Sequence, residues 1–145
     1  MAPTAHHIGI TVDDLEAMTA FYRDTLGFDV EAEVSSADDE IDAEALTTLV
    51  GISDTDLSAG FLEAPGCAVE LLKYHEPLGE SAVGVANNDI GAHQFAFEVD
   101  NIDTWHNRVV DAGAVVTSEP VDFGITPRFY CNDPEENVVE LLEAE

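Results

Sequence analysis

Two segments of the chain share one alternation of apolar and polar residues. The first is HIGITVDDL, from His7 to Leu15, and the second is QFAFEVDNI, from Gln94 to Ile102. Each alternates with the period of a half-buried strand and then reaches V-D-[DN]-[LI], where an Asp or Asn side chain can cap a helix. Each segment therefore predicts a strand followed directly by the start of a helix.

A helical pattern follows each segment. After the second, Trp105, Val109 and Ala112 lie on one face of a helix that stops at Gly113. The first pattern stops at Gly27 in the same way, and its apolar face is formed by Leu15, Met18, Phe21, Tyr22 and Leu26. We expect one helix after each strand.

The two halves also end alike, on the tetrapeptide V-E-L-L at 69–72 and at 139–142. Each copy follows a strand-like run, 58–63 or 128–131, across a turn. Pro65-Gly66 forms the first turn and Asp133-Pro134 the second. The chain is therefore predicted to contain two copies of one βαβ-hairpin unit.

The first copy is longer because it contains an acidic insertion. Its apolar residues show helical spacing up to Gly51, and they are Ile41, Ala45, Leu46, Leu49 and Val50. The polar stretch from Glu76 to Asp89 has the composition of a loop. Since 145 residues suit one domain, we expect a single domain with module one at about 5–76, a linker at about 77–90 and module two at about 91–145.

Four side chains occupy matching places in the two copies. His7 matches Gln94, and Glu70 matches Glu140. Similar units in one chain tend to pack about a pseudo-twofold axis, which would aim matching positions at one cavity. A carboxylate in an apolar strand must be solvated, paired or bound to a cation, and we expect no basic residue on these strands to neutralise the glutamates. We therefore expect the four residues to bind a divalent ion such as Zn, Ni, Co, Mn or Fe.

The fourth ligand position is open between two neighbours. The alternation counted back from Val99 turns Gln94 toward the cavity, whereas a β-bulge would turn His93 inward instead. Histidine is the better ligand for most transition metals. We expect His75 and His106, which end a strand and lie on a helix, to be surface residues.

Charge restricts the partners of the protein. Thirty-one acidic residues face four basic ones, which gives a formal net charge of −27. Such a surface is typical of proteins from concentrated salt, where charge repulsion is screened. It excludes nucleic acid and anionic membranes as partners, because both are bound through Lys and Arg.

Two cysteines, Cys67 and Cys131, lie far apart and predict buried thiols rather than a disulfide framework or a thiolate metal site. The chain has no apolar run long enough for a membrane span and no signal-peptide pattern at its start. We expect a cytoplasmic protein.

Taken together, these motifs resemble the vicinal oxygen chelate superfamily, which includes glyoxalase I, methylmalonyl-CoA epimerase, extradiol dioxygenases and the bleomycin- and fosfomycin-resistance proteins. The resemblance extends over HHIGITVDDL, FYRDTLGF, VELLKY, HQFAFEVDNI and NDPEENVVEL. It implies an α+β fold in which two βαβββ modules, related by a pseudo-twofold, form an open barrel-like cup. It also implies metal ligands at His7, Glu70, Gln94 and Glu140, the set most similar to that of glyoxalase I. Family hairpins usually read D-P-x-G-N, and Glu136 stands here in place of the glycine.

The resemblance implies a metal-dependent lyase or isomerase of glyoxalase type, acting through an enediolate on a small oxygenated substrate, which could be a thiol adduct. Glu140 or Glu70 would move the proton, and Arg128, Phe123 and Tyr130 would contact the substrate. Two alternatives stay open at this point. One is a metal-free binding protein like the bleomycin-resistance proteins; the other is a ring-cleaving dioxygenase, for which His93 would replace Gln94. We expect a homodimer, with the modules paired within one chain or across two.

Overall fold

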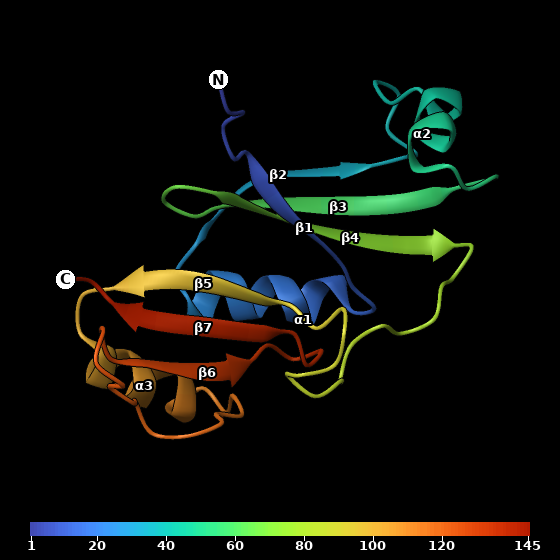
Figure 1. Cartoon of the computed structure of the whole chain (residues 1–145). Helices are drawn as coiled ribbons and strands as arrows, with labels where there is room; N and C mark the ends of the chain where they lie inside the picture. The colour runs from blue at the N-terminus through green and yellow to red at the C-terminus, as the bar shows by residue number, and fades with distance from the viewer. The chain divides into compact units, whose positions relative to one another are not determined.

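The computed structural model describes residues 1–145, and the chain forms two compact units, 1–81 and 82–145 (Figure 1). One unit contains a four-stranded sheet and the other a three-stranded sheet, each with few helices. This confirms the predicted α+β fold class.

The first unit begins with strand β1 (His7–Thr11) and helix α1 (Leu15–Ala20), which continues as a π-helical turn, η1 (Phe21–Thr25). The unit goes on with β2 (Asp29–Ser35), α2 (Ala43–Val50), β3 (Asp56–Glu63) and β4 (Ala68–Glu76). The strand order is β1-β4-β3-β2, with β1 parallel to β4 and the other pairs antiparallel.

Helix α1 starts where the polar residues of the first segment predicted it. The Asp14 carboxylate accepts a hydrogen bond from the Ala17 N–H at 3.0 Å and so caps the helix. Met18 and Tyr22 are fully buried, as are Leu62 and Leu71 of the sheet. The helix contacts β3 and β4, so the first apolar face covers this sheet.

The acidic insertion forms helix α2, as predicted. Asp42 caps its first turn by accepting from the Glu44 and Ala45 N–H groups, and Gly51 ends it in the left-handed conformation (φ 73°). None of its residues is buried.

The second unit consists of β5 (Gln94–Val99), α3 (Ile102–Asp111), β6 (Arg128–Asn132) and β7 (Val138–Glu143), in the strand order β5-β7-β6. Where the first unit has β2, this unit has only two isolated bridges, Val116 to Cys131 and Val121 to Arg128. Pro120 and Pro127 lie in this segment, and proline cannot donate to a strand ladder.

One expectation about the second unit was wrong. His106 is only 6% exposed, because α3 turns its ring against Phe129 with the ring centroids 5.0 Å apart. Its Nδ1 lies 3.6 Å from a carboxylate oxygen of Glu119. A histidine on the apolar face of an amphipathic helix is thus part of the core of the unit.

The Asp133-Pro134 turn forms as the sequence indicated, although Glu136 replaces the usual glycine. Glu136 adopts the left-handed conformation itself, with φ 67°. The Asp133 carboxylate accepts from the backbone N–H groups of Glu135 and Asn137, which fixes the turn. None of the helices in the structure is both long and apolar enough to span a bilayer.

Candidate metal and substrate site

The two units place their glutamates at the same position of the same kind of ladder. In the first, Glu70 on β4 is the ladder partner of Gly9 on the parallel strand β1. In the second, Glu140 on β7 is the partner of Ala96 on the parallel strand β5. His7 and Gln94 each stand two residues before that small partner and therefore on the same face of the strand. Residues that match in the sequence repeat thus occupy the same place in the strand pairing of each unit.

His7 and Glu70 form what we call the first half-site. The His7 Nε2 atom lies 3.9 Å from Glu70 Oε2, and the Glu70 side chain is 16% exposed. His7 Nδ1 lies 2.8 Å from His6 Nδ1, so the other ring nitrogen is the one that faces the carboxylate. A side chain on Gly9 would start 3.9 Å from Glu70 Oε1, so glycine keeps the space beside this carboxylate open.

Gln94 and Glu140 form the second half-site. The Gln94 Nε2 donates to Glu140 Oε2 at 3.1 Å, and Glu140 is 6% exposed. The amide of Gln94 can equally present its oxygen to a cation by turning over, since the two ends of an amide have nearly the same shape. Unlike Glu70, Glu140 is a buried carboxylate, so its charge requires compensation.

Arg128 provides that compensation, and sequence reasoning missed it. The Arg128 Nη1 donates to Glu140 Oε1 at 3.1 Å, from the start of the neighbouring strand β6. The expectation that no basic residue on these strands neutralises the glutamates was wrong. Lys73 lies on β4, where it pairs with Asp13, and the partner of Glu140 comes from the neighbouring strand of the hairpin. The same ladder position in the first unit is held by Ala59, which pairs with Leu72 as Arg128 pairs with Leu142. The two half-sites therefore differ in charge.

The Arg128 side chain is held from the segment that precedes β6. Its Nε donates to the Thr126 carbonyl oxygen and its Nη2 to Thr126 Oγ1, both at 3.1 Å. The guanidinium carbon lies 5.1 Å from the centre of the Phe123 ring, in a cation–π contact. Phe123 is 62% exposed, so it offers an apolar ring at the surface of this unit.

Tyr130, the other predicted substrate contact, is the antiparallel ladder partner of Glu140. Its counterpart in the first unit is Phe61, the partner of Glu70, which lies edge-on to the His7 ring with centroids 6.2 Å apart. Each glutamate is thus flanked by an aromatic residue on the hairpin strand. The H-x-G and Q-x-A patterns in the sequence indicate the small ladder partners of the two glutamates. No sequence pattern predicts that Thr126 accepts hydrogen bonds from Arg128.

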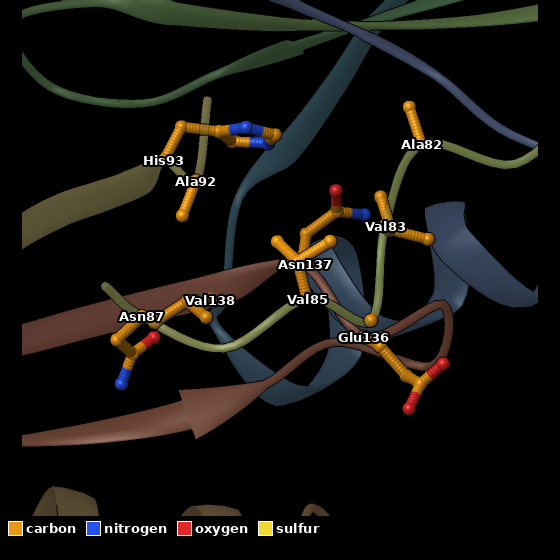
Figure 2. A pocket seen from close by; sticks show the side chains of 10 residues that line it. Ala82, Val83, Val85, Asn87, Ala92, His93, Glu136, Asn137 and Val138 are labelled. Atoms are coloured by element: carbon orange, nitrogen blue, oxygen red, sulfur yellow. The ribbon is translucent and has the colours of Figure 1, made fainter. Parts of the chain in front are cut away.

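His93 lies elsewhere in the second unit. It stands just before β5 and lines a cavity of about 20 Å³ with Asn137 and the segment from Ala82 to Asn87 (Figure 2). This volume suits one water molecule. The register that pairs Gln94 with Val138 turns the Gln94 side chain to Glu140, and the His93 ring instead lies 5.3 Å from that of Phe95.

The donor atoms of the two half-sites suit a divalent ion to different degrees. The structure gathers no group of three or more His, Cys, Asp and Glu side chains that could hold a metal. Each unit holds one pair of the predicted ligands. An imidazole nitrogen, an amide oxygen and two carboxylates are donors that borderline divalent ions accept. The first half-site fits without change, whereas a cation at the second would meet Arg128 on the same carboxylate.

The chain belongs to the Glyoxalase/Bleomycin resistance protein/Dioxygenase superfamily, whose family model matches residues 4–141. Members of this superfamily bind small-molecule ligands and commonly use divalent metals. The chain is also similar to a curated relative from Cereibacter sphaeroides, ethylmalonyl-CoA/methylmalonyl-CoA epimerase. The two are 35% identical over 115 residues, which cover 77% of this chain and 72% of the relative.

Solved structures of the same fold include a glyoxalase family protein from Bacillus cereus. It has a TM-score of 0.86 and 18% identity, with 99% of this chain and 95% of that chain covered. A fosfomycin resistance protein from Listeria monocytogenes has a TM-score of 0.64 and 16% identity, with 100% and 96% covered. At these identities the likeness shows the shared fold.

Proposed function

We propose that this protein is a metal-dependent isomerase of glyoxalase type that epimerises a carbon flanked by two carbonyl groups. The observation that carries the proposal is the matched ladder position of Glu70 and Glu140. Each glutamate pairs with a small residue on the neighbouring parallel strand, and a potential metal ligand stands two residues before that small residue. Carboxylates in such a place can take up and return a proton.

A 2-substituted malonyl thioester is the substrate class we propose. The curated relative that supports this choice is named an ethylmalonyl-CoA/methylmalonyl-CoA epimerase. The carbon to be epimerised in such a molecule lies between a carboxylate and a thioester carbonyl, so two oxygens are close enough to bind one ion. From the sequence we expected a small oxygenated substrate, with a thiol adduct as one option. The thioester narrows that class and favours isomerase over lyase chemistry.

The proposed ligands of a divalent ion, Zn, Ni, Co, Mn or Fe, are His7 and Glu70 in the first unit and Gln94 and Glu140 in the second. When bound, such an ion polarises the two substrate oxygens and acidifies the carbon between them. The contact between the Nδ1 atoms of His6 and His7 holds the imidazole so that Nε2 faces Glu70. Orientation of a ligand by its neighbour in this way strengthens a metal site.

Glu70 and Glu140 are the proposed proton carriers. Inversion of a carbon requires that the proton leave one face and return on the other, which two carboxylates can do and one cannot do without turning the substrate. Hydrogen bonds from Arg128 and Gln94 hold Glu140 in one orientation. Glu70 stands beside Gly9, where one added carbon would be in ordinary contact with Leu72 and with the carboxylate.

Arg128, Phe123 and Tyr130 are the proposed substrate contacts. A guanidinium has five N–H groups, of which Thr126 and Glu140 take three, so Arg128 can still donate to a substrate carboxylate. The exposed Phe123 ring lies against the guanidinium and can cover the apolar substituent of the same substrate.

The test is proton exchange followed by NMR. One configuration of methylmalonyl-CoA is incubated with the protein in D2O with Mn²⁺ or Co²⁺, and both loss of the methine signal and appearance of the opposite configuration are recorded. We expect E140Q and E70Q each to lower epimerisation at least about 10³-fold, with circular dichroism unchanged. E16Q and E44Q, which alter exposed glutamates on the helices α1 and α2, are the matched controls. If E140Q and E70Q both turn the substrate over at the wild-type rate, the proposal is refuted.

A metal-free binding protein is the second candidate, because Arg128 already neutralises Glu140 without an added ion. It predicts tight binding of a ligand such as bleomycin in the presence of a chelator, together with no proton exchange in methylmalonyl-CoA. Calorimetry and the NMR assay together distinguish the two functions. We also expect a homodimer, which sedimentation velocity checks.

A further inference from the structure

We infer that Arg128 acts as a built-in cation at Glu140 and competes with a divalent ion for this carboxylate, so that it sets the metal affinity of the second half-site. The inference rests on the metal site of the proposed function. All the residues involved, Arg128, Glu140 and their neighbours, lie in the second unit.

Glu140 is a buried carboxylate. Its side chain is 8% exposed, and an ionised carboxylate at this depth is stable only with a cation or several hydrogen-bond donors nearby. Both of its oxygens are occupied, Oε1 by Arg128 and Oε2 by Gln94, each at 3.1 Å. The carboxylate is therefore satisfied before any metal arrives.

The Arg128 side chain is held in place beside Glu140. Two hydrogen bonds to Thr126 and the Phe123 ring hold the guanidinium against β6. The backbone of Arg128 also exchanges hydrogen bonds with Val121 in both directions, at 2.8 and 3.1 Å. A divalent ion at Glu140 must either displace this group or bind beside a positive charge, and both choices weaken metal binding.

The two units differ in the residue at the ladder position of Arg128. Arg128 has Ala59 as its ladder counterpart, so the Glu70 carboxylate meets an uncharged residue at that position. The Glu70 carboxylate has His7 as its neighbour at 3.9 Å, a side chain that is itself a metal ligand when neutral. The competing charge is therefore specific to the second half-site.

The experiment is a titration of metal-free protein with Mn²⁺ by calorimetry, in about 1 M NaCl to screen the acidic surface. We expect R128Q to bind one Mn²⁺ about tenfold more tightly than wild type, because a fixed positive charge is removed. R128K keeps the charge and should stay within about threefold of wild type. R23Q is the matched control, because it also removes one arginine charge, from the exposed Arg23–Asp24 pair.

A double-mutant cycle ties the effect to Glu140. In the E140Q background, R128Q should no longer change Mn²⁺ affinity, because the contested carboxylate is gone. If metal-free R128Q is too unstable to titrate, thermal unfolding gives the same comparison: Mn²⁺ must raise its Tm more than that of wild type.

The inference is overturned if R128Q binds Mn²⁺ no more tightly than R23Q, or if neither wild type nor R128Q binds the ion. The first outcome leaves the proposed function standing, whereas the second, absence of metal binding, also removes the ion on which that function depends. That function is read from proton exchange in the E70Q and E140Q variants, whereas the competition is read from the metal affinity of R128Q.

Discussion

The Asn137 side-chain amide donates to both carboxylate oxygens of Asp133, at 3.1 and 2.9 Å. Both residues are buried, and together they close the turn that leads into β7. Since Glu140 lies on that strand, this pair helps to set where the second half-site stands.

Replacing Asn137 by alanine should lower the free energy of unfolding by about 2–3 kcal/mol, because a buried carboxylate loses two hydrogen bonds. Urea denaturation followed by circular dichroism measures the change. Asn107 on the exposed face of α3 provides the matched control, N107A, which should change stability by less than about 0.5 kcal/mol. Equal effects of the two substitutions would contradict the structural role of the pair.

Glu136 is a second point where the turn can be tested. A non-glycine residue at φ 67° costs about 1 kcal/mol, part of which is offset by the smaller freedom of the unfolded chain. We expect E136G to raise the free energy of unfolding by about 0.5 kcal/mol. The neighbouring E135G, at a position with negative φ, should lower it. The expectation fails if both substitutions destabilise the protein equally in urea.

Cys131 should make the protein sensitive to alkali. Burial, together with the nearby Asp133 carboxylate, raises the pKa of this thiol to about 12. The unfolded chain therefore loses the thiol proton at lower pH than the folded protein does, so its contribution to stability is present below about pH 9 and is lost between about pH 9 and 12. Unfolding by urea at a series of pH values measures the slope. C131A should flatten that slope, and an unchanged slope would show that the thiol is not responsible.

The acidic surface predicts a dependence on salt. With a formal charge of −27, repulsion among the carboxylates weakens the folded state at low ionic strength. We expect Tm to rise by roughly 5–10 °C when NaCl is increased from 0.05 to 1 M, because the Debye length falls from more than 10 Å to about 3 Å. Differential scanning calorimetry checks this, with sucrose of matched osmolality as the uncharged control. A flat response to NaCl would exclude a halophile-type surface.

Local patterns were enough to predict much of the fold. The caps Asp14 and Asp42 and the stop at Gly51 are local signals, because a helix end depends on a few neighbouring residues. The repeated V-E-L-L tetrapeptide predicted that Glu70 and Glu140 would share a position, since the period of a strand fixes which side chains face the same way.

The contacts that sequence reasoning missed depend on pairing between strands. The Arg128–Glu140 pair joins residues on neighbouring strands of a hairpin, and its register is set by the turn at Asp133 and Glu136, which departs from the family pattern. The same limit applies to His106, whose burial depends on where β6 places Phe129. Periodicity describes one element at a time and does not specify which partner faces it.

Helix α2 lies in an insertion whose two ends are hydrogen-bonded to each other. The Ser36 N–H donates to the Leu57 carbonyl at 2.8 Å, and the Leu57 N–H donates to Ser36 Oγ at 3.0 Å, so the ends of β2 and β3 are joined before the insertion begins. The chain between them can lengthen or shorten at small entropic cost. For protein engineering, 37–55 is therefore a permissive site, where another binding element could be grafted while the register that positions Glu70 is preserved.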